Sequence, residues 1–381
     1  MNEGLGFLTA IYRDGRVHIG SKSYAAGTFA VHLLNQYYKN DTAARIAVFR
    51  QNNWNVQEQL AAGYLNETDF VKAREEIQLI LILKTLPKLK PFSSLDIATE
   101  KQCIAALFTA ENAVAIQDYF RRRAAVARQD QDVIYLGILP PEYDKSLFKK
   151  YETLCATVLQ TLRFYDAIPE DMRKAYAQLR QFVSRVDAAE RFDERHLLPI
   201  AAEIFDKALF PLNTEYIAFP KRRNSRILVT ARRMTFKSYY SFVLTDFFEG
   251  LHHGHYPRRC EICGQYFLMQ SARRQKYCSY GTAPELYHGE KISCRRYAII
   301  QGKVERAKDN PLKAAYARRC AAIRSEKSRG TIPAEFAAAA QAMAKRRLEQ
   351  AEEDDTYAAR EYCKDLERTK LYADTNRRMK S

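Results

Sequence analysis

The chain has 381 residues, of which 47% are hydrophobic, and it is long enough to form several domains with a sizeable core. Its 61 Lys and Arg outnumber 45 Asp and Glu, which gives a formal net charge of +16. The first residues lack the basic and apolar regions of a signal peptide, and the longest apolar run, Ile77–Leu83, is too short to span a bilayer. We therefore expect a cytoplasmic protein without a membrane partner, whose thiols are reduced.

The first half of the sequence predicts one hairpin followed by helices. Two apolar runs, residues 7–12 and 16–19, flank Asp14-Gly15, a strong two-residue turn signal. The apolar period becomes helical from about Ala25, and helices are expected to continue to about Ala127. Residues 129–141 are polar and end in two prolines, so a domain boundary is predicted there.

The second half predicts further helices and one more hairpin. Pro169 is expected to open a separate helix that ends at Val186, and a β-hairpin is expected at about residues 215–231. Its connection carries a basic arm, Lys221, Arg222 and Arg223, with Arg232 and Arg233 just beyond. Helices are predicted at 236–251, 294–308 and 312–328 and after Pro333; Thr356 is expected to cap the last one, and residues 376–381 are expected to fray.

These patterns predict a mainly α fold with small β-hairpins (α+β) and an embedded zinc module. We expect four segments, which are an N-terminal hairpin plus helical domain at 1–135, a helical domain with a hairpin at 136–251, a zinc-binding module at 252–308 and a basic helical region at 309–381.

Four of the eight cysteines lie within residues 258–296, whereas the other four are scattered singly. Cys260 and Cys263 form a Cys-x-x-Cys pair followed by Gly264, the sequence of a zinc knuckle. Two intervening residues let both sulfurs face one point, and the glycine permits the positive φ of the turn. Structural zinc needs four ligands in a closed tetrahedron, so we expect Cys278 and Cys294 to complete the site.

A histidine, His288, is an alternative to Cys294 as the fourth ligand. Residues 279–293 contain several turn-forming residues and read as a loop, and this loop also contains His288, which could replace a cysteine. Cys294 is favoured because it follows Ser293, a good N-cap, and a thiolate in the first turn of a helix is stabilised by the helix dipole. Without metal, the four residues would be reduced buried thiols, but their paired spacing favours a metal.

The motifs around these cysteines resemble those of known zinc modules. Arg-Arg-Cys-x-x-Cys-x-x-Tyr-Phe-Leu is followed by Ser-x-Arg-x-Gln-Lys-Tyr-Cys-Ser and then by Cys-Arg-Arg. This succession resembles the C-terminal module of the CGNR zinc-finger proteins, which are described as bacterial transcriptional regulators. It is more similar still to an uncharacterised bacterial family with a Cys-x-x-Cys-Gly-x-Tyr-Phe module. The resemblance covers about residues 238–300 and implies a treble-clef or zinc-ribbon-like module that binds DNA.

The positive charge is concentrated around and after this module. Residues 251–350 hold 20 Lys and Arg against 8 Asp and Glu, which is three quarters of the excess of the whole chain. A focused basic region suggests a polyanionic partner, most often nucleic acid. The residues expected to contact nucleic acid lie beside Cys278 and on the helix that begins at Cys294, and they are Arg273, Arg274, Lys276, Arg295, Arg296, Lys303 and Arg306.

No catalytic motif stands out, so we do not expect an enzyme. Walker, Gly-x-Gly-x-x-Gly, Gly-x-Ser-x-Gly and His-Glu-x-x-His sequences are absent, and four Cys ligands leave zinc no position for a water. Two other hypotheses stay open, which are a zinc-stapled structural or protein-interaction module and an enzyme whose site lies in the first 250 residues. His252, His253 and His255 could form a second metal site, but histidines near a helix C-terminus more often interact with its free carbonyls.

Overall fold

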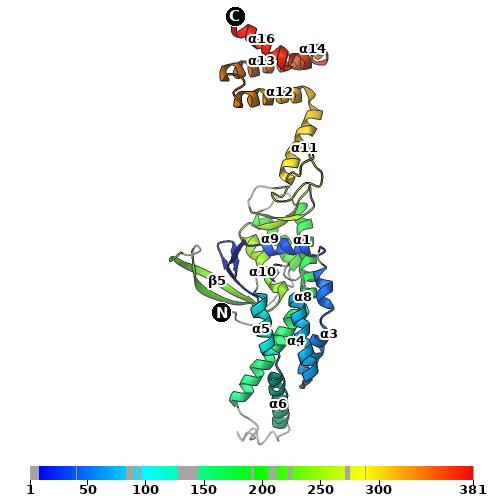
Figure 1. Cartoon of the computed structure of the whole chain (residues 1–381), viewed down its shortest axis with the longest axis vertical. Coiled ribbons are helices and arrows are strands. Elements are labelled where there is room, and N and C mark those ends of the chain that lie inside the picture. The colour runs from blue at the N-terminus through cyan, green and yellow to red at the C-terminus, as the bar shows by residue number, and fades with distance from the viewer. Residues whose placement is uncertain are drawn as a thin grey trace. The chain divides into compact units, whose positions relative to one another are not determined.

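The computed structural model describes residues 8–39, 41–82, 90–92, 96–127, 145–189, 193–205, 212–221, 225–270, 275–287 and 289–380, with the backbone alone for Thr42, Arg306 and Ala307. The chain divides into two compact units, residues 1–278 and 279–381. Both are shown in Figure 1, and the mainly helical fold with small antiparallel sheets confirms the predicted fold class. The finer division into four segments stays a prediction, and its proposed boundary at 129–141 lies outside the described residues.

A five-stranded antiparallel sheet in the first unit combines the two predicted hairpins. Its strands, in the order β3-β2-β1-β5-β4, are β3 (Lys22–Ala25), β2 (Arg16–Ile19), β1 (Leu8–Arg13), β5 (Leu228–Phe236) and β4 (Asn213–Pro220). Asp14 and Gly15 both have positive φ (48° and 69°), as the tight turn between β1 and β2 requires. β1 pairs with β5 from Leu8↔Phe236 to Tyr12↔Arg232, which joins segments more than 200 residues apart.

The other regular elements of the described first unit are helices, apart from the small hairpin of the metal centre. The helices are α1 (Thr28–Gln36), α2 (Thr42–Ala47), α3 (Gln51–Ala62), α4 (Glu67–Ile82), α5 (Ile97–Leu107), α6 (Ala110–Ala127), α8 (Lys145–Asp187), α9 (Glu194–Phe205) and α10 (Tyr239–His252). α10 is buried along nearly its whole length and packs on α8, α9 and α1, with an edge-on contact of 4.8 Å between the ring centroids of Phe182 and Phe247. None of the described helices has the length and apolar character needed to cross a lipid bilayer.

The prediction that Pro169 opens a new helix was wrong. α8 runs without interruption for 43 residues, and Pro169 lies inside it. Tyr165, Ile168, Met172 and Ala175 are all buried at helical spacing on both sides of the proline, so one apolar stripe continues through it. Burial of this stripe outweighs the cost of about 3 kcal/mol that a proline imposes on a helix interior.

Two carboxylates, the buried Asp246 and the half-buried Asp171, connect three of these helices. The first residue of α1 follows Gly27, which has φ 89° and offers no side-chain cap. Instead, the Asp246 carboxylate of α10 accepts a hydrogen bond of 2.8 Å from the Phe29 amide and further bonds from the Gly27 and Ala30 amides. In the same way, Asp171 of α8 accepts a 3.0 Å bond from the Tyr240 amide at the start of α10. Each carboxylate satisfies amide groups that a helix N-terminus leaves without partners.

The close approach of α1 and α10 explains a glycine in α10. A Cβ on Gly250 would lie 2.9 Å from the Gly27 Cα and 3.0 Å from the Ala26 carbonyl oxygen. Both atoms belong to the backbone and cannot rotate away, so only glycine lets the two helices come this close.

Asp246 should make stability depend on pH. Complete burial raises the pKa of this carboxyl to about 7, although the amide hydrogen bonds oppose the rise. Its folded-state pKa therefore exceeds the usual Asp value of about 3.9, so its stabilising contribution is complete below about pH 4 and is lost as the pH rises to about 7. We expect wild-type protein to lose about 2–3 kcal/mol more stability than Asp246→Asn between pH 5 and pH 8 in denaturant titrations. Glu170→Gln, at an exposed carboxylate, is the control, and parallel wild-type and Asp246→Asn profiles would contradict this assignment.

The second unit has its own hydrophobic core. Its helices are α11 (Cys294–Asp309), α12 (Pro311–Ser328), α13 (Ala334–Glu353), α14 (Asp355–Arg360), α15 (Tyr362–Asp365) and α16 (Arg368–Lys380). α12 and α16 pack against α13 (Figure 1). Small buried side chains on one face of α13, including Ala337, Ala340 and Ala344, let them come close. Two predictions about this unit were wrong, because Asp354 rather than Thr356 caps α14 and α16 continues as a helix to Lys380.

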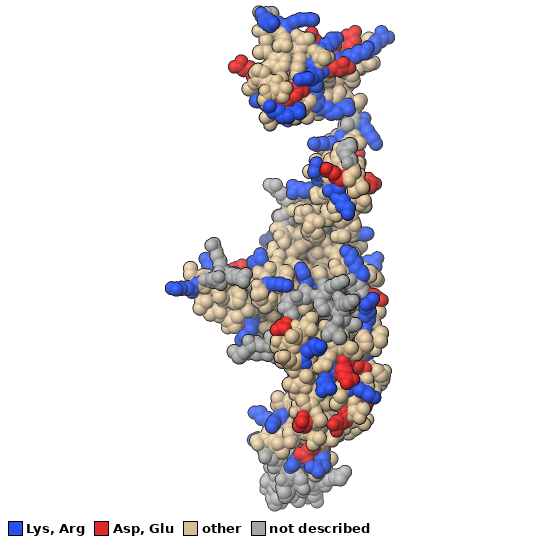
Figure 2. All heavy atoms as spheres, viewed as in Figure 1, with Lys and Arg blue, Asp and Glu red and all other residues tan. Residues whose placement is uncertain are grey.

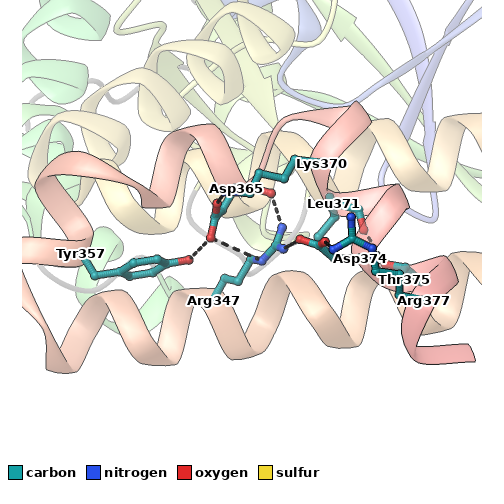
Figure 3. Close-up of polar contacts among 8 residues, drawn as sticks. All are labelled: Arg347, Tyr357, Asp365, Lys370, Leu371, Asp374, Thr375 and Arg377. Carbon is teal, nitrogen blue, oxygen red and sulfur yellow. Dashed lines mark hydrogen bonds and ion pairs between the residues drawn. The ribbon is translucent and has the colours of Figure 1, made fainter. Parts of the chain in front are cut away.

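Arg347 lies within this core, with only 8% of its surface exposed. Figure 3 shows its guanidinium between Asp365 and Asp374, donating to the Asp365 carbonyl oxygen and to the Asp374 carboxylate. The Asp365 carboxylate also accepts a 2.8 Å bond from the Tyr357 hydroxyl and pairs with Lys370 at 2.5 Å. This network ties α13 to α15 and α16 through Arg347, and α14 joins it through the bond from Tyr357 to Asp365.

Removing the guanidinium should leave the half-buried Asp365 and Asp374 carboxylates paired only with the exposed Lys370 and Arg377. We expect Arg347→Met to lower the unfolding free energy by about 2–3 kcal/mol, because the hydrogen bonds of the buried guanidinium are lost while each carboxylate keeps one exposed partner. Arg346→Met removes an exposed neighbour on the same helix and should cost less than about 0.5 kcal/mol. Thermal melting followed by circular dichroism gives the comparison, and equal melting temperatures for the two variants would refute the role assigned to Arg347.

Candidate metal centre

A short hairpin presents the first two cysteines. β6 (Tyr256–Arg259) pairs with β7 (Tyr266–Met269), and the six residues 260–265 form the connection. Within this turn the Gly264 amide donates to the Cys260 carbonyl at 3.0 Å, and the Cys260 amide donates to the Gln265 carbonyl at 2.9 Å. Gly264 has φ 69°, the conformation for which the glycine of the predicted knuckle was required.

The four predicted cysteines come together. The sulfur atoms of Cys260, Cys263, Cys278 and Cys294 all lie within 4.8 Å of one another, and those of Cys263 and Cys278 are 3.7 Å apart. A regular tetrahedron of zinc–sulfur bonds of about 2.3 Å has sulfur–sulfur edges of about 3.8 Å. Three of the residues are buried, and Cys263 is half-buried. The geometry therefore fits a single tetrahedral ion held by four thiolates.

Backbone amides already favour the thiolate form of Cys260. Burial raises the pKa of this thiol, but hydrogen bonds from the backbone of Cys263, Cys278 and Ile262 outweigh it and lower the pKa to about 7. The Cys278 amide lies 3.4 Å from the Cys260 sulfur. Because the thiolate and not the thiol binds metal, these amides prepare the site for an ion.

Two side chains that the sequence did not reveal hold the hairpin in place. Arg258 is 2% exposed, and its guanidinium donates to the Asp187 carboxylate at the end of α8 and to the Gln275 carbonyl at 3.0 Å. Asn35 of α1 bonds to both backbone groups of Tyr266, at 2.7 and 2.8 Å. Arg258 stands beside the cysteine motif in the sequence, but nothing in a single sequence pairs it with residue 187.

The segment between Cys278 and Cys294 is more ordered than the predicted loop. It contains antiparallel bridges between Thr282 and Ser293 and between Tyr287 and Glu290, and the Cys294 amide donates to the Gly281 carbonyl at 3.1 Å. Cys294 is the first residue of α11, as predicted, and the preceding Ser293 hydroxyl accepts from the Arg296 amide. The alternative ligand His288 lies outside the described residues.

The residues expected to contact nucleic acid are placed only in part. Arg295, Arg296 and Lys303 are exposed on α11, whereas Lys276 lies 3.5 Å from the Glu261 carboxylate. Arg306 lies in α11, but its side chain, like Arg273 and Arg274, is outside the described part of the chain.

The other polar groups that the sequence singled out have local partners. His252 faces Glu194 at 3.4 Å, the His253 ring packs against Gly15, and His255 lies 3.2 Å from the Ala26 carbonyl oxygen. Over the described ranges, the four cysteines form the only group of three or more metal-ligating side chains. Just beyond the basic arm, Arg232 pairs with Glu249 and Arg233 with Glu215, each at 2.6 Å, while Arg222 and Arg223 of the arm lie outside the described residues.

Comparison with known proteins gives a partial family match. The model of a family of unknown function (DUF6076) matches residues 207–378, which include the cysteine cluster and the helices up to α16. This agrees with the expected similarity to an uncharacterised family and extends well beyond the residues that suggested it. No curated protein and no solved structure was similar enough to match.

Single substitutions should test whether the four sulfurs act as one site. We expect Cys260→Ser and Cys294→Ser each to remove most of the metal found by elemental analysis of the purified protein, because a closed tetrahedral site needs all four ligands. Cys363→Ser changes an exposed cysteine outside the cluster and should leave the metal content unchanged. Full metal content in both cluster variants would contradict a four-thiolate site.

Proposed function

We propose that Cys260, Cys263, Cys278 and Cys294 bind one structural Zn²⁺. Four thiolates suit zinc better than the harder cations, which prefer oxygen ligands. The mutual sulfur distances support this assignment, and a fourth protein ligand leaves no position for a catalytic water. Such an ion would tie the knuckle to the first turn of α11. The site requires reduced thiols, which favours a reducing compartment such as the cytoplasm.

We further propose that the protein binds nucleic acid, with DNA favoured over RNA by the resemblance to zinc-finger regulators of transcription. The distribution of charge in the second unit carries this proposal. Residues 294–328, which form α11 and α12, hold 10 Lys and Arg against 3 Asp and Glu, whereas residues 334–380 hold 10 of each kind. The cationic excess therefore belongs to the two helices that follow the metal centre.

Most of these cations are available to a ligand. The exposed side chains on the two helices for which the described residues provide no ion pair are Arg295, Arg296, Lys303, Lys308, Arg318, Arg324 and Lys327. Lysines and arginines appear over α11 and the helices beyond it in Figure 2, with acidic side chains among them. By contrast, Arg319 is partly buried beside Glu326 and serves the packing of the unit.

The arrangement on α11 favours contacts with phosphates. Residues 295, 296, 299 and 303 fall within an arc of about 100° on a helix with 3.6 residues per turn. Three of them are cationic, and the first two lie in the turn that the Cys294 ligand would fix. Phosphate contacts fix the position and register of a protein on nucleic acid, while few of these side chains would be left to distinguish bases.

A protein-binding role is the second candidate. Ile299 is 52% exposed and Val304 is 46% exposed on the same helix, and large apolar side chains at the surface are common at protein interfaces. In that case zinc would only hold the knuckle and α11 together, and the basic helices would bind an acidic protein.

A salt titration tests the nucleic-acid role. We expect binding to a mixed oligonucleotide pool to weaken steeply with salt, with a log–log slope of about −4 to −7 for five to eight neutralised phosphates. The triple variant Arg295→Ala, Arg296→Ala, Lys303→Ala should make this slope less steep by about 2–3 and weaken binding to all sequences similarly.

A matched control removes three exposed cations from α8 through Lys149→Ala, Lys150→Ala and Arg163→Ala. It lowers the net charge by the same amount and should leave the slope unchanged. Equal effects of the two triple variants would show that only overall charge matters. No affinity for duplexes or single strands at about 50 mM salt would reject nucleic-acid binding and leave the protein-binding role.

A further inference from the structure

A groove of about 500 Å³ lies on the first unit between the end of α1 and the exposed face of α8. The residues that line it are mostly aromatic or cationic and include no carboxylate; they are Tyr37, Tyr38, Arg173, Tyr176, Ala177, Arg180, Gln181, Ser184 and Arg185. None of them belongs to the metal centre or to α11. The groove is nevertheless close to the knuckle hairpin, since Asn35, two residues before Tyr37, bonds to the Tyr266 backbone.

The three tyrosine rings of the groove contact one another, and the ring of Tyr38 is largely exposed. Tyr37 and Tyr176 stack with their ring centroids 4.3 Å apart and an angle of 11° between their planes. Tyr38 stands nearly perpendicular to both rings, with centroid distances of 4.9 and 5.2 Å. It is 72% exposed, so the two ring contacts hold Tyr38 in place while much of its surface stays accessible. A fixed, accessible aromatic face can stack on a planar ligand at little cost in conformational entropy.

The arginines give the groove its charge. Arg173 and Arg185 have exposed partners, Glu170 at 2.5 Å and Glu203 at 2.9 Å, and exposed ion pairs of this kind are weak. Among the described residues, Arg180 has no ion pair, and it lies about two turns after Arg173 on the same face of α8. A ligand that combines planar rings with negative charges is therefore complementary to the groove.

We propose that this groove binds single-stranded nucleic acid, with one base stacked on Tyr38 and the adjacent phosphate at Arg180. Binding sites for single strands combine a cationic track with aromatic side chains on which bases stack. A duplex is excluded from this contact because its bases are stacked inside the helix. The inference rests on the proposed function for the class of ligand, but it assigns a second site whose residues are independent of α11.

Fluorescence anisotropy with a labelled 12-nucleotide single strand and a hairpin duplex of the same composition tests the proposal. Tyr38→Ala should weaken single-strand binding about tenfold, because stacking contributes about 1–3 kcal/mol per base, and it should leave duplex binding unchanged. Tyr38→Phe keeps the ring and should bind as the wild type does. Arg180→Ala should weaken binding and make the single-strand salt slope less steep by about 0.7.

Tyr64→Ala is the matched control, since Tyr64 is also exposed, at 57%, but lies outside the groove. Unchanged thermal melting of Tyr38→Ala would show that its fold is intact.

If Tyr38→Ala binds single strands as the wild type does, the groove proposal is wrong, whereas the α11 triple variant still decides the proposed function. If free mononucleotides bind and the 12-nucleotide strand does not, the groove is a nucleotide pocket, and the assignment of a strand is overturned. Loss of single-strand binding only in the Tyr38 and Arg180 variants would uphold the groove and remove α11 from the contact.

Discussion

The Asp246 carboxylate is the constraint on which the arrangement of the larger unit depends. It is completely buried and serves as the missing cap of α1, although 217 residues separate it from the amide that it binds. An unpaired buried amide or carboxylate costs free energy, so α1 and α10 are each stable in this position only while the other is present. The absence of a side chain at Gly250 permits the contact, because any Cβ there would collide with the backbone of residues 26 and 27.

The same kind of contact continues outward to the metal centre. Asp171 of α8 holds the start of α10, Asp246 of α10 holds the start of α1, and Asn35 near the end of α1 holds the backbone of β7. Arg258 of β6 donates to the Asp187 carboxylate at the end of α8, so this series of contacts returns to the helix from which it started. The knuckle therefore rests on helices whose positions are fixed by side chains that satisfy backbone groups, and metal binding need not order this hairpin alone.

Local chemistry made part of this fold predictable. The turn at Asp14-Gly15, the knuckle ending in Gly264 and the helix beginning at Cys294 each follow from residues adjacent in the sequence. The pairing of β1 with β5 and the capping of α1 by Asp246 do not, because the partners are far apart and neither carries a periodic signal. Pro169 shows the opposite case, in which a reliable local signal is outweighed by burial on both sides of it. The groove beside Tyr38 could not be predicted from the sequence either, because its aromatic and cationic residues come from segments more than 130 positions apart.

The position of Cys294 at the first residue of α11 has a consequence for the helix beyond it. A ligand fixed in space sets the rotational phase of every later residue, because each residue advances an α-helix by about 100°. One alanine inserted between Cys294 and Arg295 would keep every charge in the chain, yet it would turn Arg295, Arg296 and Lys303 through more than a quarter of a revolution. In such a helix, orientation is encoded by counting residues from the metal-binding residue, and composition alone does not determine which way the cations point.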